Sequence, residues 1–195
     1  MPFVRTQKRK NMNSLLDPDI LKIKNNFTLY QEKIYPLVAE KCTQKKDGMH
    51  GLDTHTASVV FRGIDYALSL NQEILPVIFA CAFHDMARTN DGFDIDHGKN
   101  AIPLAKQIMK KFNLTHQMQQ SIIFAVENHT IGNIAPDYIS ACLWDADRTR
   151  LSWNYGYNSK YFNTPRAKQI ASSNCEQYLD FQRKCFPGLV WDKTY

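Results

Sequence analysis

Apolar residues recur along most of the chain at the three- and four-residue spacing of an amphipathic helix. Between residues 53 and 70, Val59 and Ile64 mark such a stripe, and His55 lies on it one turn before Val59. Comparable patterns predict helices over residues 17–38, 53–70, 73–85, 99–112, 114–129, 137–151 and 166–185. We find no convincing two-residue alternation of a strand, so the sequence predicts an all-α, single-domain helical bundle.

Breaks in these patterns set the domain organisation. Pro36 falls inside the first helical pattern and predicts a kink or break nearby. Loops are expected at residues 45–48, 89–100 and 152–165, and the second of these carries His97 and Gly98. Residues 1–16 are expected to form a disordered basic arm, and residues 17–195 a single helical domain.

The stretch from Phe79 to Arg88 holds the most informative polar residues. An apolar run typical of a fully buried helix ends there in His84 and Asp85, followed at once by Arg88. Burying an imidazole beside a carboxylate costs several kcal/mol, about 2–7 for a polar group, unless both are hydrogen-bonded, paired or bound to a metal. The His-Asp pair therefore requires partners from elsewhere in the chain.

Composition narrows the class of protein. The 195 residues are 44% hydrophobic and 22% charged, which is ordinary for one globular domain. The five cysteines include Cys81 and Cys142 in apolar helical stretches, so buried thiols in a cytoplasmic protein are expected rather than a disulfide framework. No run is long enough to span a membrane. The net charge of +5 is concentrated in the N-terminal arm, so nucleic acid is not an expected partner.

Four of the six histidines and two aspartates fall on inward helix faces or at helix ends. These six residues are His55, His84, Asp85, His97, His129 and Asp147. Helical bundles form internal metal sites by bringing ligands together from facing helices. Imidazole and carboxylate suit iron, manganese, cobalt, zinc or magnesium. The sequence therefore predicts a metal site inside the bundle.

The order of these residues resembles the HD-domain metalloenzyme superfamily in its six-ligand, two-metal form. The resemblance covers residues 50–171. Within the superfamily, this part of the chain most resembles small uncharacterised bacterial HD-domain proteins. It is carried by His50-Gly51-Leu52-Asp53-Thr54-His55, Phe83-His84-Asp85, the loop that ends in His97-Gly98, Glu127-Asn128-His129, and Trp144-Asp145-Ala146-Asp147-Arg148.

The resemblance implies a ligand set for two divalent metal ions. His84 and Asp85 would be the catalytic pair at the centre, with Asp85 able to bridge the two ions. His55 and Asp147 would complete the shell of the first ion, and His97 and His129 would hold the second. Iron or manganese is favoured, with zinc, cobalt or magnesium as alternatives.

Two ligand assignments leave alternatives open. The family more often shows His-Gly-x-x-His, and this chain has one additional residue, so His50 competes with His55 as the first ligand. His55 is preferred because Val59 then matches an apolar position of the family, although Ser58 replaces the usual arginine. Asp145 competes with Asp147 as the last ligand, and the Ala-Asp-Arg context favours Asp147.

Two such ions would activate a water as hydroxide and neutralise charge on a phosphorus centre. The sequence thus favours a metal-dependent phosphohydrolase acting on a nucleotide or another small phosphorylated molecule. Arg88, Lys99 and Arg148 would contact the phosphate, and Asp145 would contact the substrate or support a ligand.

Two other functions remain open. The same ligands resemble HD-type mixed-valence diiron oxygenases that cleave C–P or C–C bonds, and a non-catalytic regulatory domain stabilised by a metal is a third reading. The aromatic residues from Trp153 to Tyr161 would line the substrate pocket, pack internally or form a homodimer surface.

Overall fold

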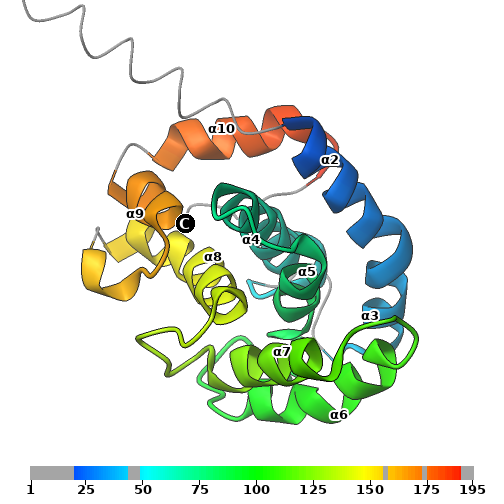
Figure 1. The fold of residues 1–195 in the computed structure, drawn as a ribbon. Coiled ribbons are helices and arrows are strands. Elements are labelled where there is room, and N and C mark those ends of the chain that lie inside the picture. Colours follow the sequence, from blue (N-terminus) through cyan, green and yellow to red (C-terminus); the bar gives the residue numbers. More distant parts are fainter. Residues whose placement is uncertain (1–19, 44–48, 156–157, 173–174, 190–195) are drawn as a thin grey trace, which may run out of the picture.

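The described part of this computed structural model, residues 20–43, 49–155, 158–172 and 175–189, contains helices and no strand. The all-α prediction is therefore confirmed for these residues. Two short π-helical turns and one 3₁₀ turn accompany the α-helices (Figure 1). In chain order the elements are α2 (Ile20–Leu29), η2 (Tyr30–Ile34), α3 (Tyr35–Lys41), η3 (Leu52–Thr56), α4 (Ala57–Ser69), α5 (Ile74–Phe83), α6 (His97–Met109), α7 (His116–Asn128), α8 (Tyr138–Tyr155), η4 (Ser159–Tyr161), α9 (Pro165–Ser172) and α10 (Cys175–Cys185).

Helices α4 and α5 form the centre of the bundle. Every residue of α5 from Pro76 to Phe83 is buried, as its uninterrupted apolar sequence predicts. Helix α4 packs against α5 and α8, and α7 packs against α5, α6 and α8 (Figure 1). Gly63 allows α4 and α5 to lie close together, because a Cβ atom there would stand 2.5 Å from the Cys81 Sγ. Cys81 and Cys142 are both buried free thiols, as expected.

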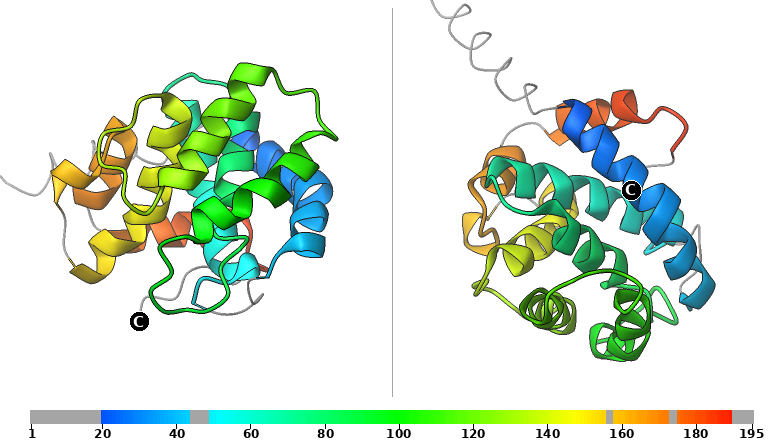
Figure 2. Two further views of the ribbon diagram at one scale, coloured as in Figure 1. Left: turned by 90° about the horizontal axis from the view of Figure 1, so that it is seen from below. Right: turned by 45° about the vertical axis from the view of Figure 1, so that its right-hand side comes forward.

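The N-terminal helical stretch wraps one side of this centre. The irregularity expected near Pro36 is present as η2, in which the Tyr35 N–H donates to the Tyr30 carbonyl instead of the residue four positions earlier. This wider turn ends at Ile34, two residues before Pro36, whose ring and missing N–H disturb an α-helical turn. Helix α10 lies beside α2 in both figures, and the Phe27 and Phe186 rings are 4.7 Å apart there (Figure 2).

Several helix boundaries differ from the predicted ones. Helix α6 begins at His97 rather than near residue 99, because the Asn100 N–H already donates to the Asp96 carbonyl. Helix α8 continues to Tyr155 instead of ending near residue 151. The single helix expected over 166–185 is two helices, α9 and α10. Helix α9 ends at Ser172, a residue type whose side chain competes with helical hydrogen bonds.

Some predictions fall on residues outside the described part of the chain. These are the arm at 1–16, the helix start at Asp17, the loop at 45–48 and the side chains from Trp153 to Tyr157. Among the described helices, none combines the length and apolar character that crossing a membrane requires.

Candidate metal centre

The bundle brings the six predicted side chains together from five parts of the chain. His55 comes from η3, and His84 and Asp85 follow the end of α5. His97 is the first residue of α6, His129 directly follows α7, and Asp147 lies within α8. Helix ends thus supply most of the cluster, where a side chain can reach the centre without disturbing the apolar helix that carries it.

One group of donors consists of His55, His84 and Asp147. The His55 Nε2 lies 3.1 Å from the Asp147 Oδ1 and 3.3 Å from the His84 Nε2. Both imidazoles are fully buried, and Asp147 keeps 26% of its side chain exposed. The set offers two nitrogens and an oxygen on the border of solvent, which suits a metal that must keep a position open for another ligand.

The second group of donors consists of Asp85, His97 and His129. The His97 Nε2 lies 2.8 Å from the Asp85 Oδ1 and 2.8 Å from the His129 Nε2. The His129 Nε2 is 3.7 Å from the same carboxylate oxygen. All three side chains are buried, so their charge is weakly screened by water.

Asp85 divides its two oxygens between these groups. Its Oδ2 is 3.5 Å from the His84 Nε2 and 3.8 Å from the His55 Nε2. Its Oδ1 instead faces His97 and His129. Burial alone would raise the pKa of Asp85, but the surrounding imidazoles, His84 foremost, hold that pKa well below its ordinary value. Asp85 is therefore ionised and placed between two sets of nitrogen donors.

Backbone hydrogen bonds orient three of the histidines. The Nδ1 atoms of His84 and His129 lie 2.7 Å from the carbonyl oxygens of Cys81 and Val126, respectively. The Nδ1 of His97 makes the same kind of bond to the Asp94 carbonyl. A carbonyl oxygen only accepts, so each Nδ1 donates, and the Nε2 of a neutral ring then turns its lone pair toward the centre.

This orientation favours a cation at the centre. Two imidazole lone pairs only 2.8 Å apart, as at His97 and His129, repel each other unless a proton or metal ion is bound to them. Burial lowers the pKa of His84 to about 4 against the opposing effect of Asp85, so its ring is neutral at pH 7 and free to bind a metal. Burial would also lower the pKa of His97, yet Asp85 raises it overall. The donors therefore fit divalent metal ions.

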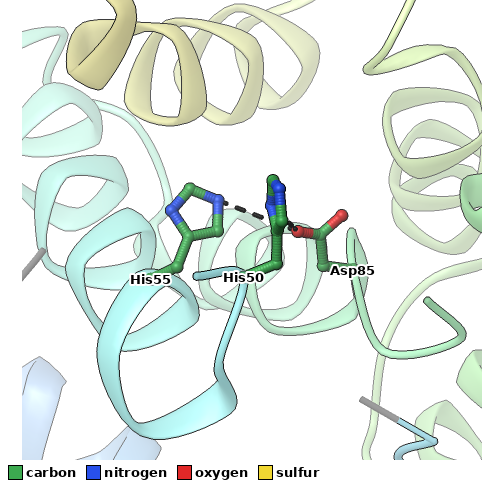
Figure 3. Close-up of side chains that lie close together, drawn as sticks. All are labelled: His50, His55 and Asp85. Atoms are coloured by element: carbon green, nitrogen blue, oxygen red, sulfur yellow. Dashed lines mark hydrogen bonds and ion pairs between the residues drawn. The ribbon is translucent and has the colours of Figure 1, made fainter. Parts of the chain in front are cut away.

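His50 joins His55 beside Asp85, although the sequence presented the two histidines as alternatives. Figure 3 shows both imidazoles directed toward the carboxylate. The His50 Nδ1 lies 3.2 Å from the Asp85 Oδ2, and the His50 and His55 rings meet edge to face at 5.4 Å. His50, His55 and Asp85 form a third set of donors near enough to share an ion.

Among the four residues expected to contact substrate, Arg88 lies against the centre. Its Nε donates to the Asp85 Oδ1 at 3.3 Å, and its side chain is 12% exposed. Lys99 is exposed in the first turn of α6. Arg148 donates to the carbonyls of His129, Gly132 and Tyr161, with its guanidinium 5.6 Å from the Trp144 ring centroid.

Asp145 does not join the cluster. Its carboxylate accepts hydrogen bonds from the backbone N–H groups of Asn163 at 2.8 and 3.0 Å and of Thr164 at 2.6 Å. Residues two apart on a helix point in nearly opposite directions, about 200° apart, so Asp147 faces the histidines while Asp145 faces the segment before α9.

A second buried charged cluster escaped the sequence reasoning. Asp65 of α4 is 1% exposed and accepts hydrogen bonds from the Arg166 Nε at 3.0 Å and the Tyr178 hydroxyl at 2.8 Å. Arg62, fully buried in the same helix, donates to the Ala146 carbonyl at 2.8 Å. The sequence signal for this cluster was the presence of Arg62 and Asp65, one turn apart, within an otherwise apolar helix.

Gly98 controls how closely α6 approaches the end of α7. A Cβ atom at this position would lie 2.5 Å from the Val126 carbonyl oxygen and 3.1 Å from the His129 ring. We expect Gly98→Ala to push His97 and His129 apart, to cost about 1–3 kcal/mol of stability and to weaken metal binding. Gly188→Ala is the control, because nothing lies within 4 Å of its Cβ position. Thermal denaturation and metal content measure both effects, and an unchanged Gly98→Ala protein would contradict the prediction.

A comparison with solved structures supports this architecture. No protein-family model matches the sequence, and no curated protein matches it. A solved structure of a predicted HD superfamily hydrolase from an uncultured Thermotogales bacterium matches with a TM-score of 0.60 and 18% sequence identity, over 80% of this chain and 90% of that chain. The described part of the chain therefore shares its helical fold with that protein, and three groups of its His and Asp side chains lie close enough together to hold metal ions.

Proposed function

We propose that this chain is a metal-dependent phosphohydrolase that acts on a nucleotide or another small phosphorylated molecule. The observation that carries the proposal is Asp85, whose two oxygens face two separate sets of imidazole donors. A carboxylate shared in this way is suited to bridging a pair of divalent ions. Two ions of that kind, when bound, lower the pKa of a water and neutralise charge at a phosphoryl group.

The chain's own residues would hold this centre rigid. Backbone carbonyls fix the imidazoles of His84, His97 and His129, so their Nε2 atoms need no rearrangement to bind a metal. Nitrogen and carboxylate donors favour iron or manganese in the proposal, and the same donors accept zinc, cobalt or magnesium. Two ions are proposed, with His55, His84, Asp85 and Asp147 around the first and Asp85, His97 and His129 around the second.

Substrate recognition is proposed to rest on Arg88 and Lys99. Arg88 is beside the centre and presents guanidinium N–H groups that suit phosphate oxygens. Lys99 is exposed in the first helical turn after His97. Arg148 and Asp145 contact backbone groups of neighbouring loops, so in this proposal they hold the segments around the metal centre in place.

Phosphate release from purified protein tests the proposal. Metal-free protein is loaded anaerobically with Mn²⁺ or Fe²⁺ and incubated with nucleoside phosphates and dinucleoside polyphosphates. We expect release that requires the metal, is stopped by a chelator and falls by more than about 100-fold in His84→Ala. His116→Ala is the matched control, because His116 is exposed at the start of α7.

Equal release by wild type and His84→Ala would refute the assignment of the centre. Absence of phosphate release together with substrate-dependent O₂ consumption by the iron-loaded protein would instead identify an oxygenase. Either result is distinguishable from misfolding, because circular dichroism reports helix content in each variant.

A further inference from the structure

The two groups of donors differ in the charges placed beside them. The first, His55 and His84, has the additional carboxylate of Asp147 at 3.1 Å from the His55 Nε2. The second, His97 and His129, has the guanidinium of Arg88, whose terminal nitrogen lies 3.5 Å from the His97 Nε2. A positive ion therefore meets extra negative charge at the first group and a fixed positive charge at the second.

Arg88 is held in this position from two sides. Its Nε donates to the Asp85 Oδ1 at 3.3 Å, and its Nη1 donates to the Gly92 carbonyl at 2.9 Å. That Asp85 oxygen is also 2.8 Å from the His97 Nε2. Arg88 thus uses the oxygen that a metal ion at the second group would need.

From this geometry we infer that Arg88 competes with the second metal ion for the Asp85 Oδ1. The inference rests on the proposed two-metal centre and adds that its two ions bind with different affinities. The first ion binds tightly between His55, His84, Asp85 and Asp147. The second binds more weakly, because it must displace Arg88 from Asp85.

The physical basis is the charge of both competitors. An arginine stays protonated at any pH the protein encounters, so it cannot leave the oxygen by losing its charge. Repulsion between a guanidinium and a divalent ion is strong where water is largely excluded, as it is around Asp85 at 2% exposure. The Gly92 carbonyl gives Arg88 an anchor that would remain after it leaves Asp85.

Titration of the metal-free protein with Mn²⁺ tests the inference, with free Mn²⁺ followed by electron paramagnetic resonance. We expect wild type to bind one ion tightly and a second with a dissociation constant at least about tenfold larger. Arg88→Gln and Arg88→Met should lower the second constant by about tenfold or more and leave the first unchanged. Exchange coupling between two bound Mn²⁺ ions should appear at lower Mn²⁺ in these variants.

Two control variants separate charge from other effects. Arg88→Lys keeps the positive charge and should keep the second ion weak. Arg183→Gln removes a positive charge from the exposed surface of α10, where Arg183 pairs with Asp180, and should bind Mn²⁺ as wild type does.

Equal affinity for two ions in wild type would overturn the inference, as would failure to bind a second ion or an unchanged second constant in Arg88→Gln and Arg88→Met. If neither neutral variant folds, equal affinity for two ions in wild type would still overturn the inference. Phosphate release is scored separately. Unequal Mn²⁺ binding without hydrolysis of any phosphate would refute the proposed function alone, and hydrolysis with two equal ions would refute this inference alone.

Discussion

Asp85→Asn is expected to abolish metal-dependent phosphate release and to lower the metal content of the protein at both groups of donors. Both carboxylate oxygens face imidazoles, the Oδ2 toward His84 at 3.5 Å and the Oδ1 toward His97 at 2.8 Å. Asparagine keeps one oxygen and replaces the other with an amide NH₂ group, which does not bind a metal. Elemental analysis of metal-loaded protein and a phosphate assay measure the two losses.

Asp65→Asn is the matched control for this experiment. Asp65 is as buried as Asp85 and is also paired with an arginine, but its partners are Arg166 and Tyr178. Removing the charge from a buried ion pair costs about 3–5 kcal/mol, so this variant should melt at a lower temperature. It should nevertheless bind the metal and release phosphate per folded molecule as wild type does. Loss of metal in both variants would mean that Asp85 acts only through stability.

The fold was predictable because burial in this chain follows helical periodicity closely. The apolar run of α5 is buried from Pro76 to Phe83, and the His-Asp pair lies where that run ends. The convergence of six polar side chains was predictable from a different source. Each of them interrupts or ends an apolar stripe, and the order of the blocks resembles one known arrangement of ligands.

The relation between His50 and His55 was beyond such reasoning. Spacing along the chain presents the two as alternatives, yet η3 turns the segment so that both reach the Asp85 Oδ2, at 3.2 and 3.8 Å. A π-helical turn of this kind carries no proline or glycine signal within its own residues, and π-turns are rare. Its presence depends on packing against the rest of the bundle, which the sequence pattern does not report.

For Asp145 and Asp147, by contrast, helical geometry already predicts that only one of the two can be a metal ligand. Only one of two residues that are two positions apart can face the cluster. In the sequence, the Ala-Asp-Arg context is what favours Asp147 over Asp145. What distinguishes them in the structure is the partner segment at Asn163 and Thr164, which lies far along the chain.

Asp145→Asn and Asp147→Asn are therefore expected to have opposite effects. Asp145 accepts the backbone N–H groups of Asn163 and Thr164, and an amide NH₂ in place of one oxygen would face a donor with another donor. We expect Asp145→Asn to lose about 2–3 kcal/mol of stability, or about 4–12 °C in melting temperature, with metal content unchanged. Thermal denaturation and elemental analysis of the same preparation give both quantities.

Asp147→Asn should instead keep its melting temperature in the metal-free state and lose the tightly bound ion. Its carboxylate is 26% exposed and lies 3.1 Å from the His55 Nε2, so the amide can still hydrogen-bond there and to water. A metal ion, however, loses one of its negatively charged ligands, and its dissociation constant should rise by about 10–100-fold. If Asp145→Asn lost the metal and Asp147→Asn kept it, Asp145 would have to turn from the backbone of Asn163 to the histidines, and the first donor group would be assigned to the wrong aspartate.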